Sequence, residues 1–562
     1  MPASVTTDAE ATAPALNHDL ASALGWRAVE RDGARLWFAG YLFGSSAERA
    51  LAALPAKLDL DALARWAAGL DGHFALLAMR PGWAVAAVDR VRSIPLFLAR
   101  IGDGWRLGAH ADALRRRAGL GSAEIDPEAA LQVAMAGYTI DRATLYRGLV
   151  QLGPGELALC HAGRVPERRR YYTYRPWRVR LETQERLARD LAESIRRVFD
   201  KTAASLAGRA VAVPLSAGLD SRLVLCGLKQ AGCRDLRAFS YGLAGNFEAE
   251  TARRVAEALG VPWRFVPLSA RSQRAHFASV DFRAYLDYAD SCAATPFPQD
   301  LPVLRALLAD GFLPADTVVV NGNSGDYISG NHLPANLHDP ACELDEERRR
   351  ACIIDALIDK HFALWTALMS DTSRVRIGAA LAESLAAAGA ELGDADTDHG
   401  LYEYAEFQDR QCKYVIAGQR VYEHAGLDWR LPLWDRDVLD FWEGVPLTAK
   451  AGQRLYRETL AALDWGGVWR GVPVNRRTVR PAWLAPIRLA AKAAHAPLGR
   501  ARWREAERRW FAWWMDNLGN YGLVPYRRVV ADRRGHRNAI SWHTEAYLNR
   551  HGLAWHGGPL AP

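Results

Sequence analysis

The chain has 562 residues, of which 50% are hydrophobic and 24% charged, a composition typical of soluble globular proteins with two or three domains. Its formal net charge of +7 is small for this length. That charge permits anionic small-molecule partners and does not indicate nucleic-acid binding. Nowhere do about 18 uncharged apolar residues follow one another, so we expect no membrane-spanning helix.

The cysteines and the N-terminal segment both favour a cytoplasmic location. The seven cysteines contain no CxxC pair, which favours reduced, mostly buried thiols. The first 25 residues, MPASVTTDAEATAPALNHDLASALG, lack the basic and then apolar pattern of a signal peptide.

Residues 37–174 are predicted to form a sandwich of sheets with helices. Apolar runs such as GHFALLAMRPGWAVAAVD and IPLFLARIGDGWRLGAH are interrupted by Gly, Asp or Pro, the pattern of short strands joined by turns. Between them, DLDALARWAAGL and DPEAALQVAMAGY have helical periodicity.

The pattern changes to alternating helices and strands after residue 178. A long amphipathic helix over 181–206 comes first, and the strand, loop and helix of AVAVPLSAGLDSRLVLCGL follow it. Further strands are predicted in LRAFSYGL, WRFVPLS and TVVVNGNSGD. This alternation predicts an α/β fold with a doubly wound parallel sheet, in which SAGLDS and NGNSGD lie at the carboxyl ends of strands, where ligands bind.

The remaining sequence completes a three-domain interpretation. Residues 341–426 are mainly helical in pattern, and the chain from Arg477 onward is rich in Arg and Trp. We therefore expect domains at 1–178, 179–475 and 476–562.

The loop SAGLDS has the composition of an anion-binding turn. A strand that ends in small residues before a helix presents free N–H groups to an anion, and Ser216 and Ser221 add hydroxyl donors. The lysine of a Walker-type loop is absent, which suits pyrophosphate as a leaving group, with Asp220 holding Mg²⁺. An ordinary strand and helix with a capping residue is the alternative.

These residues resemble the asparagine synthetase family. LSAGLDS is similar to the S-G-G-x-D-S pyrophosphate loop of the ATP-pyrophosphatase superfamily, with Ala217 in place of the first Gly. VVNGNSGDYISG and WRLPLWDRDVLDFWEGVPLTAKAGQRLYRETL resemble that family's second nucleotide loop and late catalytic segment. Upstream, LDGHFALLAMRPGWAVAAVDRVRSIPLFLAR resembles its N-terminal glutaminase domain, which implies an αββα sandwich.

The resemblance implies a role for each matching residue. Pyrophosphate would be bound by Ser216, Gly218 and Ser221, and Mg²⁺ by Asp220 and Asp326. ATP would also contact a set of residues outside the pyrophosphate loop: Leu215, Tyr241, Asn321 and Gly322. Lys450 would stabilise charge on the departing phosphate and the tetrahedral carbon; an exposed lysine at a helix start is its alternative.

The N-terminal domain departs from the family in its nucleophile. A class II glutaminase uses a cysteine at the mature N-terminus, whereas this chain starts Met1-Pro2 and its first cysteine is Cys160. A wrongly assigned start codon is the alternative. We expect no glutamine hydrolysis, as in the cysteine-lacking branch that includes beta-lactam synthetases and lasso-peptide cyclases.

The second loop departs from the family as well. Asn323 replaces a glutamate and Gly325 a serine, so a general base must come from elsewhere. The candidates are Tyr327, Tyr402, Glu403, Tyr404 and Glu406, most of which we expect to face solvent on helices. In ISGNHLPANLHD, the polar residues are expected to belong to an ordinary loop, although they would also suit hydroxyl recognition or a metal site: Asn331, His332, Asn336 and His338.

The basic tail suggests two further roles. A helix with arginines on one side and tryptophans on the other can lie in a membrane interface, but packing of the tryptophans on the synthetase domain is the favoured interpretation. Nucleic-acid binding is not expected.

Three functions are consistent with the sequence. The leading one is an ATP-dependent amide ligase that adenylates a carboxylate and couples it to an amine. The others are an asparagine synthetase that uses ammonia or glutamine, and a non-catalytic nucleotide-binding module.

Overall fold

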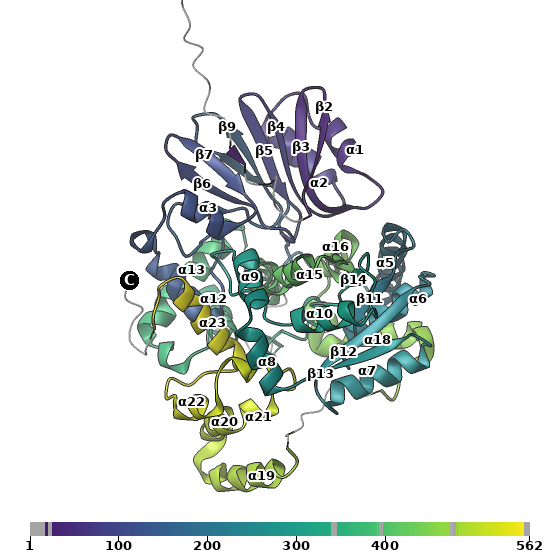
Figure 1. The fold of residues 1–562 in the computed structure, drawn as a ribbon, viewed down its shortest axis with the longest axis vertical. Helices are drawn as coiled ribbons and strands as arrows, with labels where there is room; N and C mark the ends of the chain where they lie inside the picture. The colour runs from purple at the N-terminus through teal and green to yellow at the C-terminus, as the bar shows by residue number, and fades with distance from the viewer. Residues whose placement is uncertain are drawn as a thin grey trace, which may run out of the picture. The chain divides into compact units, whose positions relative to one another are not determined.

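The computed structural model describes residues 17–18, 20, 25–338, 345–390, 392, 397–472, 474, 479 and 481–555. These residues form two compact units (Figure 1). The first unit consists of the described residues within 1–121 and 147–172. The second consists of those within 122–146 and 173–562.

The first unit is built from two sheets and three helices. Its elements are β1 (Asn17–His18), β2 (Arg27–Arg31), β3 (Ala34–Leu42), α1 (Ala47–Ala52), α2 (Leu60–Gly69), β4 (Gly72–Arg80), β5 (Trp83–Val88), β6 (Phe97–Ile101), β7 (Gly104–Gly108), α3 (Ala111–Arg117), β8 (Leu149–Gln151), β9 (Glu156–His161) and β10 (Glu167–Arg170). One sheet has the order β10-β9-β5-β4-β3-β2 and the other β1-β7-β6-β8. All pairings except β1 with β7 are antiparallel.

Burial in this unit follows from its apolar strands. Nearly every residue of β4 and β5 is buried, on both faces of the sheet. Leu63 and Trp66 of α2 join Phe74 and Leu76 in one apolar core, while α3 packs on β6, β7 and β8. The predicted αββα sandwich is confirmed.

The second unit is organised around one parallel sheet. Its strands are β11 (Val211–Pro214), β12 (Leu236–Leu243), β13 (Trp263–Leu268), β14 (Val318–Val320) and β15 (Asp428–Arg430). Their order is β13-β12-β11-β14-β15, and every pair is parallel. The predicted doubly wound sheet is confirmed. The chain winds from β11 towards β13 and then returns to the other side of β11, so the winding direction reverses between β11 and β14.

Helices account for most of the remaining residues of the second unit. The α-helices are α4 (Pro127–Ala136), α5 (Gln184–Ser205), α6 (Leu219–Gln230), α7 (Phe247–Ala258), α8 (Ala270–Phe277), α9 (Val280–Ala289), α10 (Leu301–Ala309), α11 (Gly325–Ile328), α12 (Glu346–His361), α13 (Asp371–Ala387), α14 (His399–Ala405), α15 (Arg420–Ala425), α16 (Arg436–Glu443), α17 (Leu447–Lys450), α18 (Arg454–Leu463), α19 (Leu484–His495), α20 (Gly499–Trp510), α21 (Ala512–Met515), α22 (Tyr526–Ala531) and α23 (Ala539–Arg550). A π-helical segment, η5 (Glu406–Val415), follows α14 directly.

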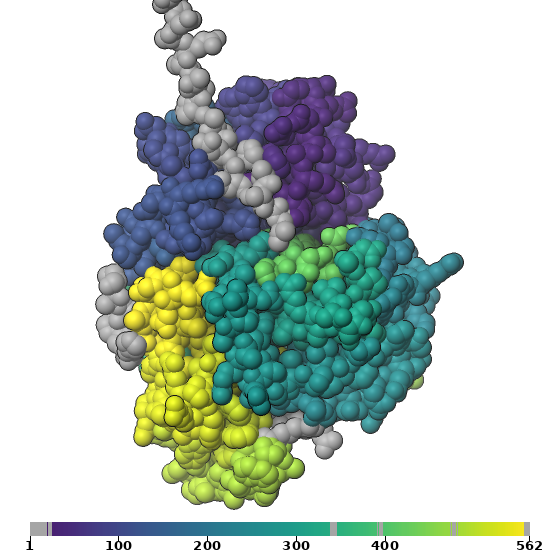
Figure 2. Space-filling view, viewed as in Figure 1, coloured from purple at the N-terminus to yellow at the C-terminus, as the bar shows by residue number. Residues whose placement is uncertain are grey.

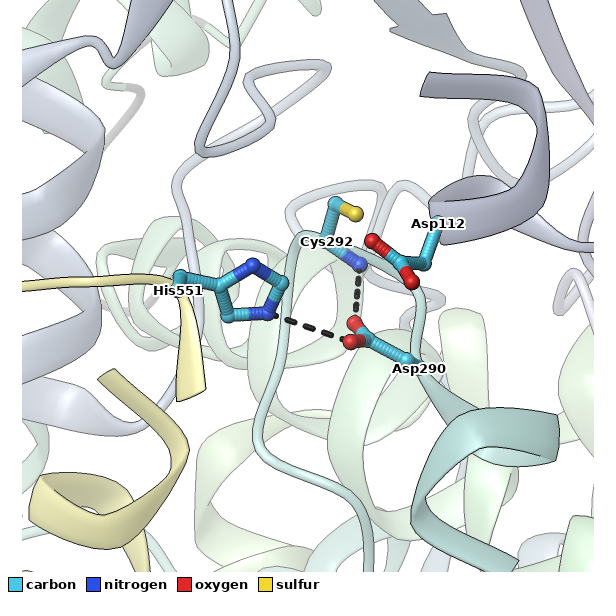
Figure 3. Close-up of side chains that lie close together, drawn as sticks. All are labelled: Asp112, Asp290, Cys292 and His551. Carbon is cyan, nitrogen blue, oxygen red and sulfur yellow. Dashed lines mark hydrogen bonds and ion pairs between the residues drawn. The ribbon is translucent and has the colours of Figure 1, made fainter. Parts of the chain in front are cut away.

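A buried ion pair anchors the end of α23 to the segment that follows α9. His551 Nε2 lies 3.1 Å from Asp290 Oδ2 (Figure 3). The other oxygen of Asp290 accepts hydrogen bonds from the Tyr547 hydroxyl and the Cys292 N–H, at 2.9 and 2.8 Å. The end of α23 is thus held to the segment after α9 by a network in which both carboxylate oxygens of Asp290 have partners.

No described helix has both the length and the apolar composition needed to cross a bilayer. Among the described cysteines, Cys352 is exposed and Cys233 half-buried, and four are buried: Cys160, Cys226, Cys292 and Cys412. Cys342 lies outside the described residues.

Candidate active site

The two polar loops of the second unit meet at one edge of its sheet. β11 and β14 are neighbouring parallel strands, with Val211 aligned with Val318, so the chain leaves both strands at the same edge. The first loop leads into α6 and the second into α11. Because the winding direction reverses between these two strands, a crevice forms here, and it is the usual ligand position in such sheets.

A cavity of about 450 Å³ lies between the loops, within the usual range for small-molecule sites. Nine of the ten sequence-predicted site residues line it: Leu215, Ser216, Gly218, Asp220, Ser221, Tyr241, Asn321, Gly322 and Asp326. Lys450 is not among the lining residues. The structure therefore gathers the expected nucleotide and metal residues around one space.

Hydroxyl groups shape the first loop. Ser216 Oγ accepts a hydrogen bond from the Gly218 N–H at 3.1 Å, and it lies 3.1 Å from Ser221 Oγ. Ser221 Oγ also accepts from the Ser216 N–H at 3.1 Å. The loop closes on itself in this way, and the N-terminal turn of α6 lines the cavity. Such a turn favours an anion such as a phosphate group.

The second loop packs directly on the first. Asp220 Oδ2 accepts a hydrogen bond from the Asp326 N–H at 2.7 Å, and Asp220 Oδ1 accepts one from the Tyr456 hydroxyl at 2.9 Å. Two glycines make this approach possible. A Cβ on Gly325 would lie 2.5 Å from Asp220 Cγ, and one on Gly322 would lie 2.9 Å from the Asp220 carbonyl carbon.

The electrostatics of the aspartate pair suit a divalent cation. Burial, together with the neighbouring Asp326 carboxylate, raises the pKa of Asp220 to about 8. For Asp326 burial acts in the same direction, but the hydrogen bond and charge of His332 outweigh it and hold the pKa below its ordinary value. Two adjacent carboxylates are hard oxygen donors of the kind that Mg²⁺ prefers, and a cation between them would relieve their repulsion.

A charged network extends from Asp326 into the helical region. His332 Nε2 lies 3.1 Å from Asp326 Oδ2, and His332 Nδ1 lies 2.5 Å from Glu406 Oε1. Glu406 is fully buried and also contacts His361 and Arg410, each at 3.1 Å. Burial raises the pKa of Glu406, but the two histidines dominate and keep it well below its ordinary value. His332 is thus fixed between two carboxylates, so the ordinary-loop expectation is wrong for it.

Lys450 lies at the end of α17, away from the cavity lining. Its Nζ donates to Glu403 Oε2 at 2.6 Å, and both side chains are buried. Burial raises the pKa of Glu403 to about 6, against the opposing effect of Lys450. The exposed lysine that was the alternative is therefore wrong, because this ammonium is enclosed and paired.

The general-base candidates are buried, so the expectation that most of them face solvent is wrong. The relative exposures of Tyr327, Tyr402, Glu403, Tyr404 and Glu406 are 2% or less. The segment from α14 into η5 is surrounded by protein, so it has no polar outer face of the kind that helical periodicity assumes. None of the five lines the described cavity.

Sequence reasoning missed a polar cluster at the adenosine side of the proposed site. Asp300 is buried and lines the cavity. It accepts hydrogen bonds from the hydroxyls of Tyr241 and, at 2.8 Å, Tyr422. Tyr422 in turn accepts from Asn321 Nδ2 at 2.7 Å. No local motif marks Asp300, because its partners are distant in sequence.

Of the polar residues in ISGNHLPANLHD, Asn331 lines the cavity and His332 belongs to the network above. The side chains of Asn336 and His338 lie outside the described residues. Asp290, Cys292 and His551 also bring ligand-type atoms within 4.8 Å of one another. Since both Asp290 oxygens are already engaged, we interpret that cluster as structural.

The sheet, the two loops and the aspartate pair form an α/β domain with one polar cavity, and one known family matches this part of the chain. Residues 194–464 match the asparagine synthase family model. That stretch contains β11 to β15 and both loops. Over these residues the chain is similar to asparagine synthases.

Comparisons with whole protein sequences and with solved structures gave no close relative. None of the curated proteins matches the chain in sequence. Among solved structures, the chain is similar to the glutamine phosphoribosylpyrophosphate amidotransferase of B. subtilis complexed with ADP and GMP, at 12% identity over 43% of this chain and 72% of that one, with a TM-score of 0.19. It is also similar to an allosteric regulatory enzyme of purine biosynthesis, at 13% identity over 42% of this chain and 61% of that one, with a TM-score of 0.18.

Proposed function

We propose that the protein is an AMP-forming amide ligase that adenylates a carboxylate substrate, releases pyrophosphate and couples the acyl group to an amine without hydrolysing glutamine. One observation carries this proposal. Asp220 and Asp326 follow neighbouring strands, are joined by a 2.7 Å hydrogen bond, and line one cavity with an anion-binding loop. We also propose a cytoplasmic location and the three-domain division at residues 178 and 475.

The lining residues suit the parts of ATP. Ser216, Gly218 and Ser221 would bind the pyrophosphate portion through hydroxyl and N–H groups. The adenosine side would be contacted by Leu215 and Tyr241, with Asn321 and Gly322 from the second loop. Asp220 and Asp326 would hold Mg²⁺, which when bound neutralises charge on the phosphates.

The chemistry balances with these groups. A carboxylate oxygen of the substrate bonds to the α-phosphorus of ATP, and the bond to pyrophosphate breaks. The amine nitrogen then bonds to the acyl carbon, AMP leaves, and the amine loses one proton. Lys450 would stabilise the negative charge that develops on the departing phosphate and at the tetrahedral carbon. Its buried pairing with Glu403 supports this role, because the pairing holds the Lys450 side chain in one position.

The amine would come from a substrate other than glutamine. In the first unit, Cys160 is buried in β9, and burial raises the pKa of its thiol to about 12. A thiol with that pKa is protonated at neutral pH and is a poor nucleophile. This supports an amine that is already part of a second substrate.

An asparagine synthetase reaction with free ammonia is the second candidate, and the family match over 194–464 favours it. Aspartate and ammonium would then support release of AMP and pyrophosphate. Other carboxylate and amine pairs would not.

A pyrophosphate-release assay tests the proposal. A screen of carboxylates and amines with ATP and Mg²⁺ first identifies an active pair. Asp220→Ala and Asp326→Ala should each lower release by at least about 100-fold, because the metal-binding pair is broken. Asp316→Ala is the matched control, since this aspartate is exposed and precedes β14. Unchanged release in Asp220→Ala, with circular dichroism like that of the parent, would remove the loop from the mechanism.

A further inference from the structure

Large apolar side chains are exposed at one place in the C-terminal region. Trp483 is 60% exposed and Ile487 51% exposed at the start of α19, and Leu498, three residues after its end, is 63% exposed. Figure 2 shows this segment, in light green, at the molecular surface. Exposed apolar side chains that cluster in this way mark interaction surfaces.

Four exposed residues at α19 form an apolar stripe that is separate from the face packed on the protein. Trp483, Ile487, Ala490 and Ala494 are spaced by four, three and four residues, so they share one side of the helix, and all four are exposed. The inner face packs elsewhere: Leu484 joins Trp503 of α20 in a small apolar core. An ordinary surface helix has one apolar face, and α19 has a second.

Apart from Trp483, the tryptophans around α20 and α21 do not supply this surface. Trp503 is buried, and its ring lies 6.1 Å from that of Phe511. Trp513 and Trp514 contact Tyr526. These contacts join residues of the tail to one another, so Trp503, Trp513 and Trp514 are packed within the tail, and α19 remains as the exposed element.

The segment that carries the stripe is rich in positive charge. Residues 483–510 contain seven Arg and Lys and two Glu, a surplus of five positive charges in a chain whose total is +7. Four basic residues of this segment are exposed: Lys492 on the side of α19 away from the stripe, and Arg500, Arg502 and Arg504 on α20. Basic residues beside an apolar helix face complement the anionic headgroups and acyl chains of a lipid bilayer.

We propose that α19 and the start of α20 form a docking surface for an anionic lipid bilayer. The stripe of Trp483, Ile487, Ala490 and Ala494 enters the headgroup region, and the basic residues contact the phosphates. The proposal is independent of the ligase reaction.

Co-sedimentation of the full-length protein with vesicles tests this surface. Vesicles of phosphatidylcholine with about one third phosphatidylglycerol should bind the protein, and pure phosphatidylcholine should bind it at least about ten-fold more weakly. Raising the salt concentration should weaken binding to the anionic vesicles, because the attraction of exposed charges is screened.

Two variants of α19 separate the stripe from the net charge. Ile487→Asp should reduce binding to anionic vesicles by about ten-fold, because it places a carboxylate in the apolar stripe. Leu489→Asp adds the same charge at a position that is 67% exposed and off the stripe, and it should reduce binding by less than about three-fold.

Three results would overturn the proposal. The first is no binding to anionic vesicles, and the second is equal loss in both variants. The third is a concentration-dependent dimer, seen by light scattering and abolished by Ile487→Asp, in a protein that does not bind vesicles. That result would assign the stripe to a second copy of the chain.

Discussion

At the scale of single residues, the site depends on the close approach of Asp220 to the second loop, where position 325 is a glycine. Asp220 reaches the second loop only because position 325 has no Cβ. The hydrogen bond from the Asp326 N–H to Asp220 then fixes the carboxylates relative to each other.

Gly325→Ala tests this contact. The new Cβ would lie 2.5 Å from Asp220 Cγ, so one of the loops must move. Since small displacements of catalytic groups are costly, we expect pyrophosphate release to fall by about 100-fold, while the folded structure persists. Gly452→Ala is the control, because its Cβ meets nothing within 4 Å, although its φ of +61° adds some backbone strain. Full activity in Gly325→Ala would mean that the close approach is not needed.

The residue scale also shows why part of the site was predictable. Asp220, Ser216 and Ser221 lie within one short segment at a strand end, and local sequence suffices to find them. Asp300 at the cavity and Glu406 in the network beside it are held by partners more than 50 residues away, such as Tyr241 and His332. Such contacts depend on tertiary packing, which a motif does not encode.

At the scale of elements, the sheet was predictable and the helical region was less so. The strands of both units are short apolar runs between turn residues, and their pattern indicates them directly. The segment from α14 through η5 is mostly buried and includes a π-helix. Sequence periodicity assumes a solvent face and 3.6 residues per turn, so it misplaced Glu403 and Glu406.

The anchor of α23 gives a prediction at this scale. In His551→Ala, Asp290 would remain buried without its ion-pair partner, at a cost of about 3 kcal/mol in the free energy of unfolding. Asp287→Ala is the matched control. It breaks the exposed pair with Arg550, and it should cost about 0.5 kcal/mol. Denaturant titration of both variants makes the comparison. Equal small losses would show that the Asp290 network does not hold the helix.

At the scale of the whole molecule, buried histidines make the fold sensitive to acid. Burial lowers the pKa values of His361, His536 and His543 to about 4, whereas an unfolded histidine has a pKa of about 6.5. Each therefore stabilises the fold fully above pH 6.5, and this contribution is lost as the pH falls from 6.5 to 4.

We expect the free energy of unfolding to decrease by about 1–2 kcal/mol for each of these histidines between pH 7 and 5. Two other groups, His332 and Asp220, lower the free energy of unfolding as the pH rises. Although burial lowers the pKa of His332, the carboxylates of Glu406 and Asp326 raise it to about 9, so its contribution is lost from pH 6.5 to 9. Asp220, with a pKa of about 8, loses its contribution as the pH rises from about 4 to 8.

Chemical denaturation at several pH values checks this dependence. In His543→Gln, the slope on the acid side should become shallower, because one fewer proton is taken up on unfolding. A slope unchanged from that of the parent would show that His543 titrates normally in the folded protein.

The contact between Gly325 and Asp220 also constrains how this chain can diverge. Each position restricts the other through space, although 104 residues separate them. A lineage that acquires a bulkier residue at 325 keeps the two loops in contact only if a smaller residue replaces Asp220 or the backbone shifts. Descendants with the same chemistry should therefore inherit the two positions as one unit.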